Sequence, residues 1–203
     1  MASPAQPIPA PQRITASNLP ISASTAADPK SEPGVEVIVD TLPVDPIAGL
    51  PELGRARVAT TKSVPASNDG HGNIPLDDVP GVGIVLANGI NVYYIDIAPH
   101  SEGTMHRTTS TDYIIVVQGT LSFMTPAGPF NVETGYGEAK ETLAHPGSTV
   151  VQRGIMHALS NRTDQYVRLL GVVVSSAPNR VPVEADSSSA QQEPRILNDA
   201  WLP

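Results

Sequence analysis

Residues 105–119, MHRTTSTDYIIVVQG, carry the pattern that decides the fold. The stretch begins at His106, continues through small hydroxyl side chains to Asp112, and then becomes an apolar run that ends in a glycine. A run rich in β-branched and aromatic residues and closed by a glycine is typical of a β-strand that reverses direction. If residues 104–109 are also extended, His106 and Thr108 lie on one face of the chain, because side chains alternate along a strand. The stretch therefore predicts a strand that is preceded by polar groups.

Short runs of the same kind recur along the chain. We predict further strands at residues 35–40, 55–61, 82–87, 91–97, 120–125, 148–154 and 165–176. Many of the 21 prolines and 16 glycines lie between these runs, where they favour turns. Many short strands at regular spacing predict a closed or sandwiched all-β structure rather than a parallel α/β sheet. We expect residues 125–143 to form a long decorated hairpin and residues 195–203 to form a short helix that docks on the barrel.

Length and composition favour one folded domain preceded by an arm. The chain has 203 residues, 40% of them hydrophobic, which suits a single buried core. Residues 1–34 contain few large apolar side chains, so burial does not offset the entropy cost of ordering them. We expect a partly disordered N-terminal arm over residues 1–34, in which 13–21 could lie along the domain, and a barrel domain over 35–203. Unpaired edges of the strands at 35–40 and 55–61 predict a homodimer.

The charge and the residue types exclude several classes of function. The net charge is −8, and the 12 lysines and arginines form no run, so nucleic acid and anionic membranes are excluded as partners. The chain has no cysteine, which excludes disulfides, thiolate nucleophiles and Cys-ligated zinc. No stretch approaches the roughly 20 apolar residues that span a bilayer, and the first residues lack the pattern of a secretory signal. We therefore expect a cytoplasmic protein.

A second block of residues repeats the combination of turn, strand and histidine. Residues 145–161, HPGSTVVQRGIMHALSN, begin with a Pro-Gly turn, continue as a predicted strand, and end in Gly154, His157 and Asn161. The spacing of these three residues is Gly-x-x-His-x-x-x-Asn. The chain thus carries two histidine-containing blocks, in order, with strand patterns between and around them.

The two blocks resemble the paired motifs of the cupin superfamily. The first cupin motif reads His-x-His, three or four residues, Glu, six residues and Gly, and here Thr108 stands for the second histidine and Asp112 for the glutamate. The second motif ends as residues 154–161 do, with Arg153 at the place of its usual proline. Segments such as EGTMHRTTSTDY (102–113) and VVQRGIMHALSNRTD (150–164) further resemble small single-domain cupins of filamentous fungi. The resemblance implies a double-stranded β-helix, a jelly-roll barrel.

The same resemblance implies a role for three residues. His106, Asp112 and His157 would point into the barrel and hold a divalent metal such as Zn, Fe, Mn or Ni. Threonine is a poor substitute for the missing imidazole, and aspartate has less reach than glutamate, so metal affinity would be weak. The alternative is a metal-free site in which a neutral imidazole, paired with a carboxylate, acts as acid or base, so that activity follows the titration of an imidazole. Both alternatives make these three residues the candidate catalytic residues, and no nucleotide cofactor is expected.

Four further polar residues are candidates for contacts with a substrate: Thr108, Tyr94, Gln152 and Arg168. Gln152 and Arg168 lie inside predicted strands among apolar neighbours, and alternation alone does not decide which face they occupy. Tyr93 and Tyr94 are adjacent, so one faces inward and the other outward. His100 is the reserve candidate for a further metal ligand.

Members of the resembled group often accompany secondary-metabolite genes, which implies a hydrophobic small-molecule substrate such as a polyketide-like intermediate. The first expectation is an enzyme of the lyase or isomerase class, acting by dehydration, decarboxylation or a proton shift. The alternatives are a metal-dependent oxidoreductase or oxygenase and a metabolite-binding protein without turnover. The fold admits all three classes, so the site has to distinguish them.

Overall fold

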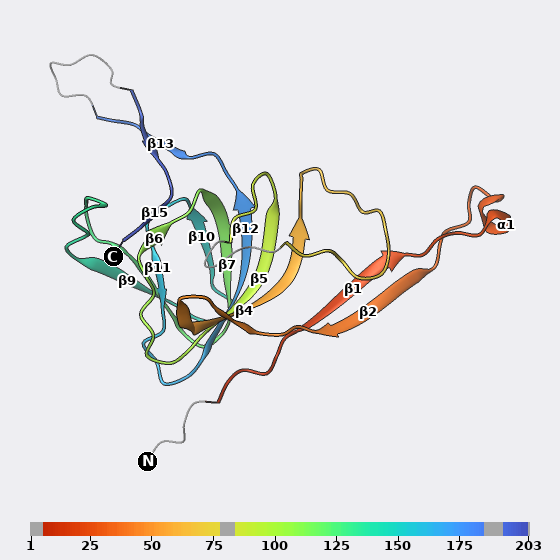
Figure 1. The fold of residues 1–203 in the computed structure, drawn as a ribbon, viewed down its shortest axis with the longest axis horizontal. Helices are drawn as coiled ribbons and strands as arrows, with labels where there is room; N and C mark the ends of the chain where they lie inside the picture. Colours follow the sequence, from red (N-terminus) through yellow and green to blue (C-terminus); the bar gives the residue numbers. More distant parts are fainter. Residues whose placement is uncertain (1–5, 78–83, 185–192, 203) are drawn as a thin grey trace.

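The computed structural model shows a barrel whose eight strands surround a common interior (Figure 1). The structure describes residues 6–77, 84–184 and 193–202. The eight strands are β5 (Ile90–Ile97), β6 (His106–Arg107), β7 (Ser110–Gln118), β8 (Leu121–Pro126), β9 (Ala139–Ala144), β10 (Thr149–Arg153), β11 (Ala158–Ser160) and β12 (Val167–Ser175). Most of the predicted runs are strands. Gly119 has a φ of 79°, which permits the predicted reversal between β7 and β8.

The strands pair antiparallel in a nested order. The outermost strands of the eight, β5 and β12, pair with each other, and β7 pairs with β10 and β8 with β9. His106 bridges His157, which joins β6 to the start of β11. Further pairing of β12 with β7 and of β11 with β8 gives two sheets, in the orders β10-β7-β12-β5-β4-β3 and β11-β8-β9. This order is that of a double-stranded β-helix, so the predicted fold class is confirmed.

Additional strands extend the larger sheet or form small two-stranded sheets. They are β3 (Asp45–Ile47), β4 (Leu50–Thr61), β13 (Asn179–Val181), β14 (Arg195–Leu197) and β15 (Ala200–Trp201). β4 pairs with β5, and β15 pairs with β6. The helix predicted at residues 195–203 is therefore wrong, because the backbone there pairs with other strands instead of with itself. The predicted docking on the barrel is confirmed, since Leu202 is buried in a cluster with Met105, Met124 and Met156.

The core lies between the two sheets and follows the alternation of the strands. Ile97, Ile114, Leu121 and Leu169 are buried against one another.

The strand predicted at residues 82–87 is absent where the structure describes this segment. Residues 84–86 have no regular structure, and a turn follows at 87–88, while 82–83 lie outside the described residues. No helix in the described part of the chain is long and apolar enough to cross a membrane.

A two-stranded ribbon projects from the barrel (Figure 1). It consists of β1 (Gln12–Asn18) and β2 (Val35–Thr41), which pair antiparallel, with the short helix α1 (Ala23–Ala26) between them. Arg13 connects the base of the ribbon to β4, because the Arg13 guanidinium donates to Asp40 and to the carbonyl of Val58 in β4. The segment 13–21 thus lies largely within a ribbon outside the barrel. The disorder expected for the arm stays a prediction.

The exposed apolar face of the ribbon is a candidate contact surface for the predicted homodimer. Val39 lies opposite Ile14 in the register, and the two side chains are 59% and 69% exposed. A two-stranded ribbon is only marginally stable alone in water, so a second copy that covers this face would stabilise it. We expect light scattering at micromolar concentration to give twice the mass of one chain, and a Val39→Lys variant to give a smaller dimer fraction. A wild-type protein with the mass of one chain would contradict the prediction.

Candidate functional site

One cavity between the sheets contains all three predicted catalytic residues. His106, Asp112 and His157 line it, and most of its wall is aliphatic, with Ile95, Ile97, Ile114, Leu159, Leu169 and Val173 among the contributors. Its volume is about 80 Å³, which leaves room for several water molecules. The side chain of Trp201 also lines the cavity while 42% of the residue is exposed, so it lies between the cavity and solvent. A substrate larger than this volume therefore requires side chains at the mouth to move.

The two histidines are placed together by the backbone. The N–H of His106 donates to the carbonyl of His157 at 2.8 Å, and the N–H of His157 donates to the carbonyl of His106 at 2.9 Å. Their ring centroids are 4.4 Å apart. Each Nδ1 contacts a backbone carbonyl, of Thr104 at 2.8 Å for His106 and of Ile155 at 3.0 Å for His157. A carbonyl only accepts, so each Nδ1 carries the hydrogen and each Nε2 keeps its lone pair.

Burial keeps both imidazoles neutral. Desolvation lowers the pKa of His157 to about 3, and the neighbouring His106 adds to the effect. Desolvation also lowers the pKa of His106, against the opposing effect of its bond to the Thr104 carbonyl. Trp201 contributes to this burial, because its ring is stacked on the His106 ring with centroids 4.1 Å apart and planes 6° apart. At neutral pH the cavity therefore holds two imidazole lone pairs and no imidazolium.

Asp112 brings a carboxyl group to the same cavity. It lies on β7 directly opposite Gln152 of β10, whose Nε2 donates to Asp112 Oδ2 at 2.8 Å. Asp112 Oδ1 is buried and has no hydrogen-bond partner. Desolvation raises the pKa of Asp112 from 3.8 to about 6, although the nearby Ser110 hydroxyl, whose hydrogen-bond partner is Thr108 Oγ1, acts in the opposite direction. The carboxyl can therefore exchange a proton close to neutral pH.

The raised pKa of Asp112 predicts a pH-dependent stability difference. A folded-state pKa above the unfolded value means that stability is highest below pH 3.8 and is lost as the pH rises through about 6. At about 1.4 kcal/mol per pKa unit, the loss is about 3 kcal/mol. We expect Asp112→Asn to be more stable than wild type by up to about that amount at pH 8 and equal to it at pH 4. Urea unfolding at both pH values measures this, and a difference that does not depend on pH would contradict it.

The grouping of the three donors, rather than their chemical type, departs from that of a metal centre. The residue types suit one, since two Nε2 lone pairs and an unpartnered carboxylate oxygen are available. Within the described residues, however, no three His, Cys, Asp or Glu side chains are grouped closely enough to hold one ion. His106 and His157 are adjacent, and the third donor is not grouped with them. Metal binding by His106, Asp112 and His157 stays a prediction.

The four predicted substrate contacts divide between two faces. Gln152 is buried beside Asp112, and Thr108 is bonded to Ser110 Oγ at 2.9 Å in a separate polar pocket. None of the four lines the cavity, and Tyr94 and Arg168 also lie on the other side of the sheet from it. Ile95 and Leu169, their neighbours in sequence, point into it, so the alternation of the strands turns Tyr94 and Arg168 outward. Tyr93 is the inward member of its pair and is buried.

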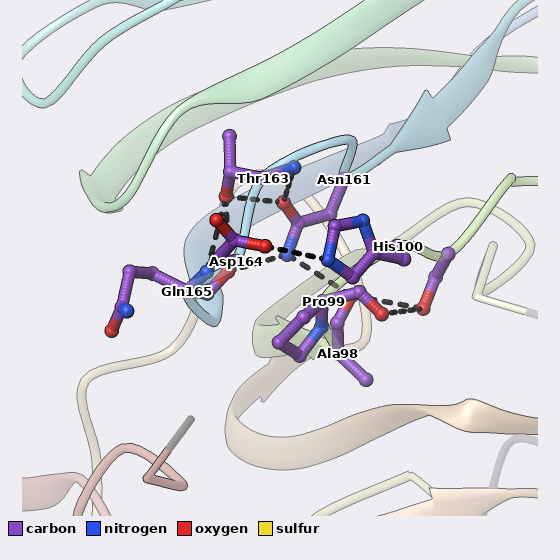
Figure 2. Close-up of polar contacts among 8 residues, drawn as sticks. Ala98, Pro99, His100, Asn161, Thr163, Asp164 and Gln165 are labelled. Atoms are coloured by element: carbon purple, nitrogen blue, oxygen red, sulfur yellow. Dashed lines mark hydrogen bonds and ion pairs between the residues drawn. The ribbon is translucent and has the colours of Figure 1, made fainter. Parts of the chain in front are cut away.

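The second motif has a structural role at Asn161 (Figure 2). Its Nδ2 donates to the carbonyls of Ile97, Ala98 and Gln165 at 3.1, 3.0 and 2.7 Å. Its Oδ1 accepts from the backbone N–H and the hydroxyl of Thr163. One side chain thus joins the end of β5 to the turn before β12. His100 lies beside this turn and contacts Asp164 at 2.8 Å on the surface, so the reserve ligand is not in the cavity (Figure 2).

The stacking of Trp201 on His106 is the feature of the site that the sequence did not reveal. The only available signal was a single tryptophan near the C-terminus of a chain with 4% aromatic residues. Phe123 adds a second aromatic neighbour, with its ring centroid 6.1 Å from that of His157. The two imidazoles are therefore held between aromatic rings as well as by backbone carbonyls.

The chain is similar to several known proteins. No protein-family profile matches the chain. The chain is 28% identical over 145 residues to phomopsin biosynthesis cluster protein D of Diaporthe leptostromiformis, covering 70% of each chain. It is 26% identical over 106 residues to the cupin-domain-containing oxidoreductase fogC of Aspergillus ruber, covering 52% of this chain and 47% of that relative. Among solved structures, a cupin-2 domain protein of Rhodospirillum rubrum is 12% identical, with 75% of this chain and 66% of that chain covered and a TM-score of 0.38.

Proposed function

We propose that this protein, which has the cupin fold and relatives in fungal biosynthesis clusters, is a lyase or isomerase that moves protons on an apolar small molecule. The observation that carries the proposal is the set of groups that line one apolar cavity. Two imidazoles there keep free Nε2 lone pairs, and one carboxyl has a pKa of about 6. Groups whose pKa values differ in this way are typical of a site that uses one as base and the other as acid.

The proposed roles follow from the protonation states. Nε2 of His157 accepts a proton from the bound molecule, because this imidazole is neutral and its Nδ1 is held by the Ile155 carbonyl. The protonated carboxyl of Asp112 donates a proton at a second position of the molecule. In an isomerisation the second proton replaces the first, whereas in a dehydration it leaves with the hydroxyl group as water. The aliphatic walls exclude bulk water and so strengthen both interactions.

An oxidoreductase is the second candidate, and one observation favours it. The relative from Aspergillus ruber is named a cupin-domain-containing oxidoreductase. That relative matches 52% of this chain, and the match is 26% identical. The proton-transfer roles, in contrast, use groups that line the cavity of this chain, so we rank proton transfer first.

Metabolite profiling of a strain that lacks the gene tests the proposal. We expect one precursor to accumulate in this strain. Purified protein should then convert the precursor in deuterium oxide that contains EDTA. The expected product is a deuterium-labelled isomer, or a molecule that has lost water or carbon dioxide. A product that has gained oxygen or lost two hydrogens would favour the oxidoreductase, whereas an isomer that forms only without EDTA would show that the proton transfer depends on a metal. An unchanged metabolite profile, together with tight binding of a metabolite by the purified protein, would favour a binding function.

A further inference from the structure

Two buried hydrogen-bond acceptors in and beside the cavity wall have no donor: Asp112 lines the cavity, and Gln152 hydrogen-bonds Asp112 without lining it. They are Asp112 Oδ1 and Gln152 Oε1, and neither atom has a partner among the described residues. The residues are 2% and 0% exposed, so bulk water does not satisfy these atoms. A buried polar atom without a partner is destabilising, and most such atoms in folded proteins are paired. This pair therefore requires an explanation that the fold alone does not provide.

The register of the sheet places the two acceptors together. Asp112 and Gln152 are direct cross-strand partners on β7 and β10, and the bond from Gln152 Nε2 to Asp112 Oδ2 fixes both side chains. With that donor engaged, the amide has its acceptor oxygen left over. Asp112 lines the cavity, and so do His106 and His157, whose Nε2 atoms are also acceptors. This end of the cavity is thus rich in acceptors, while most of the wall is aliphatic.

We propose that Asp112 and Gln152 form a subsite that binds a hydrogen-bond donor of the substrate. The chemical class is an apolar molecule that carries a hydroxyl or N–H group at one end. The inference deepens the proposed function, since it concerns the same cavity. A hydroxyl can donate to either acceptor, which removes the free-energy penalty of burying that acceptor without a hydrogen bond. A ketone or an ether at the same place has no hydrogen to donate, and its oxygen would face two further acceptors.

Preference for a donor over a matched acceptor can be measured without knowing the substrate. Cyclohexanol and cyclohexanone have nearly the same size and differ in the ability to donate. Trp201 is the only tryptophan of the chain and lines the cavity, so its fluorescence reports binding of either probe. We expect wild-type protein at pH 8 with EDTA, where Asp112 is ionised and its oxygens only accept, to bind cyclohexanol roughly tenfold more tightly than cyclohexanone, as one satisfied hydrogen bond implies.

Variants show whether the preference comes from this pair. Gln152→Met removes the amide oxygen but also frees Asp112 Oδ2, so the number of bare acceptors is unchanged and we expect the ratio of the two Kd values to stay near that of wild type. Asp112→Asn adds an N–H donor at the other acceptor, so the ratio should shift toward the ketone, which also covers the case in which Gln152→Met does not fold. Gln165→Met is the control: its side chain is exposed and distant from the cavity lining, and it should keep the wild-type ratio.

Equal affinity of wild-type protein for the two probes, tighter binding of the ketone, or no saturable signal with either probe would overturn the inference. So would an unchanged ratio in Asp112→Asn. None of these results depends on turnover. If the probes show the preference but no precursor is converted, the donor-binding subsite stands and the proton-transfer proposal fails. If a precursor is converted without the preference, the reverse holds.

Discussion

Replacing His157 with glutamine is expected to reduce turnover of the substrate by about 10²–10⁴-fold while the barrel stays folded. The variant removes the proposed base, whereas the amide still offers an N–H toward the Ile155 carbonyl, which His157 Nδ1 now contacts at 3.0 Å. The precursor that accumulates in the deletion strain supplies the substrate, and kcat/KM is the quantity to compare. The matched control is His145→Gln, because His145 is exposed and its ring contacts only the Thr120 hydroxyl at 3.3 Å. Similar kcat/KM values for the two variants would contradict the assignment.

The pH profile of the wild-type enzyme adds a check on the roles. His157, with a pKa of about 3, stays a base throughout the neutral range. Asp112 donates only when protonated, and its pKa is about 6, so kcat/KM is expected to fall as the pH rises above 6. We expect Asp112→Asn to lose this dependence along with most of the activity. A profile that rises through pH 6 to 7 would instead indicate that the Asp112 carboxylate is the base.

This profile differs from the one that the sequence alone suggests. An imidazole ordinarily titrates near neutral pH and a carboxyl group well below it, so the sequence assigns the neutral titration to a histidine. In the structure the same burial acts on both groups in opposite directions, because it disfavours the charged form of each. It lowers the pKa values of His106 and His157 and raises that of Asp112. Burial is a property of the packed barrel, so residue identities alone could not reveal that Asp112, and not a histidine, titrates near neutral pH.

The same limit explains which elements were predicted. The long strands β5, β7 and β12 have alternating burial, and a period of two is visible in the sequence. β6 and β15 have two residues each and exist because Trp201 pairs with His106 and Ala200 with Arg107, which lie more than ninety positions apart. No local pattern carries that information. The helix expected at residues 195–203 failed for this reason.

Register also decides what a polar residue inside a strand does. Gln152 and Arg168 have similar sequence surroundings, and the sequence left their faces open. Gln152 lies opposite Asp112, on the cavity side of the sheet, whereas Arg168 lies opposite Asp96, on the other side. One is therefore part of the candidate site, and the other is part of a buried ion pair that supports the sheet.

Removing the carboxylate of that ion pair is expected to have the largest effect on stability. Arg168 donates to both oxygens of Asp96 at 2.6 Å, and a third bond of 2.6 Å reaches the carbonyl of Pro9. The two residues are 6% and 8% exposed. Asp96→Ala leaves the guanidinium buried without a counter-ion, and loss of one partner of such a pair typically costs about 3–5 kcal/mol. Urea unfolding at pH 7 gives the free energy of unfolding directly.

Two further variants test whether the loss of stability comes from the unpaired buried charge of Arg168. In the double variant Asp96→Leu, Arg168→Met no buried charge is left unpaired, so we expect most of the lost stability to return. Asp164→Ala is the control on the surface: it removes the partner of His100, whose side chain is 65% exposed, and should change the free energy of unfolding little. If Asp96→Ala were as stable as Asp164→Ala, the pair would not support the sheet. If the double variant were less stable than Asp96→Ala, the loss would come from packing around the pair and not from the bare charge.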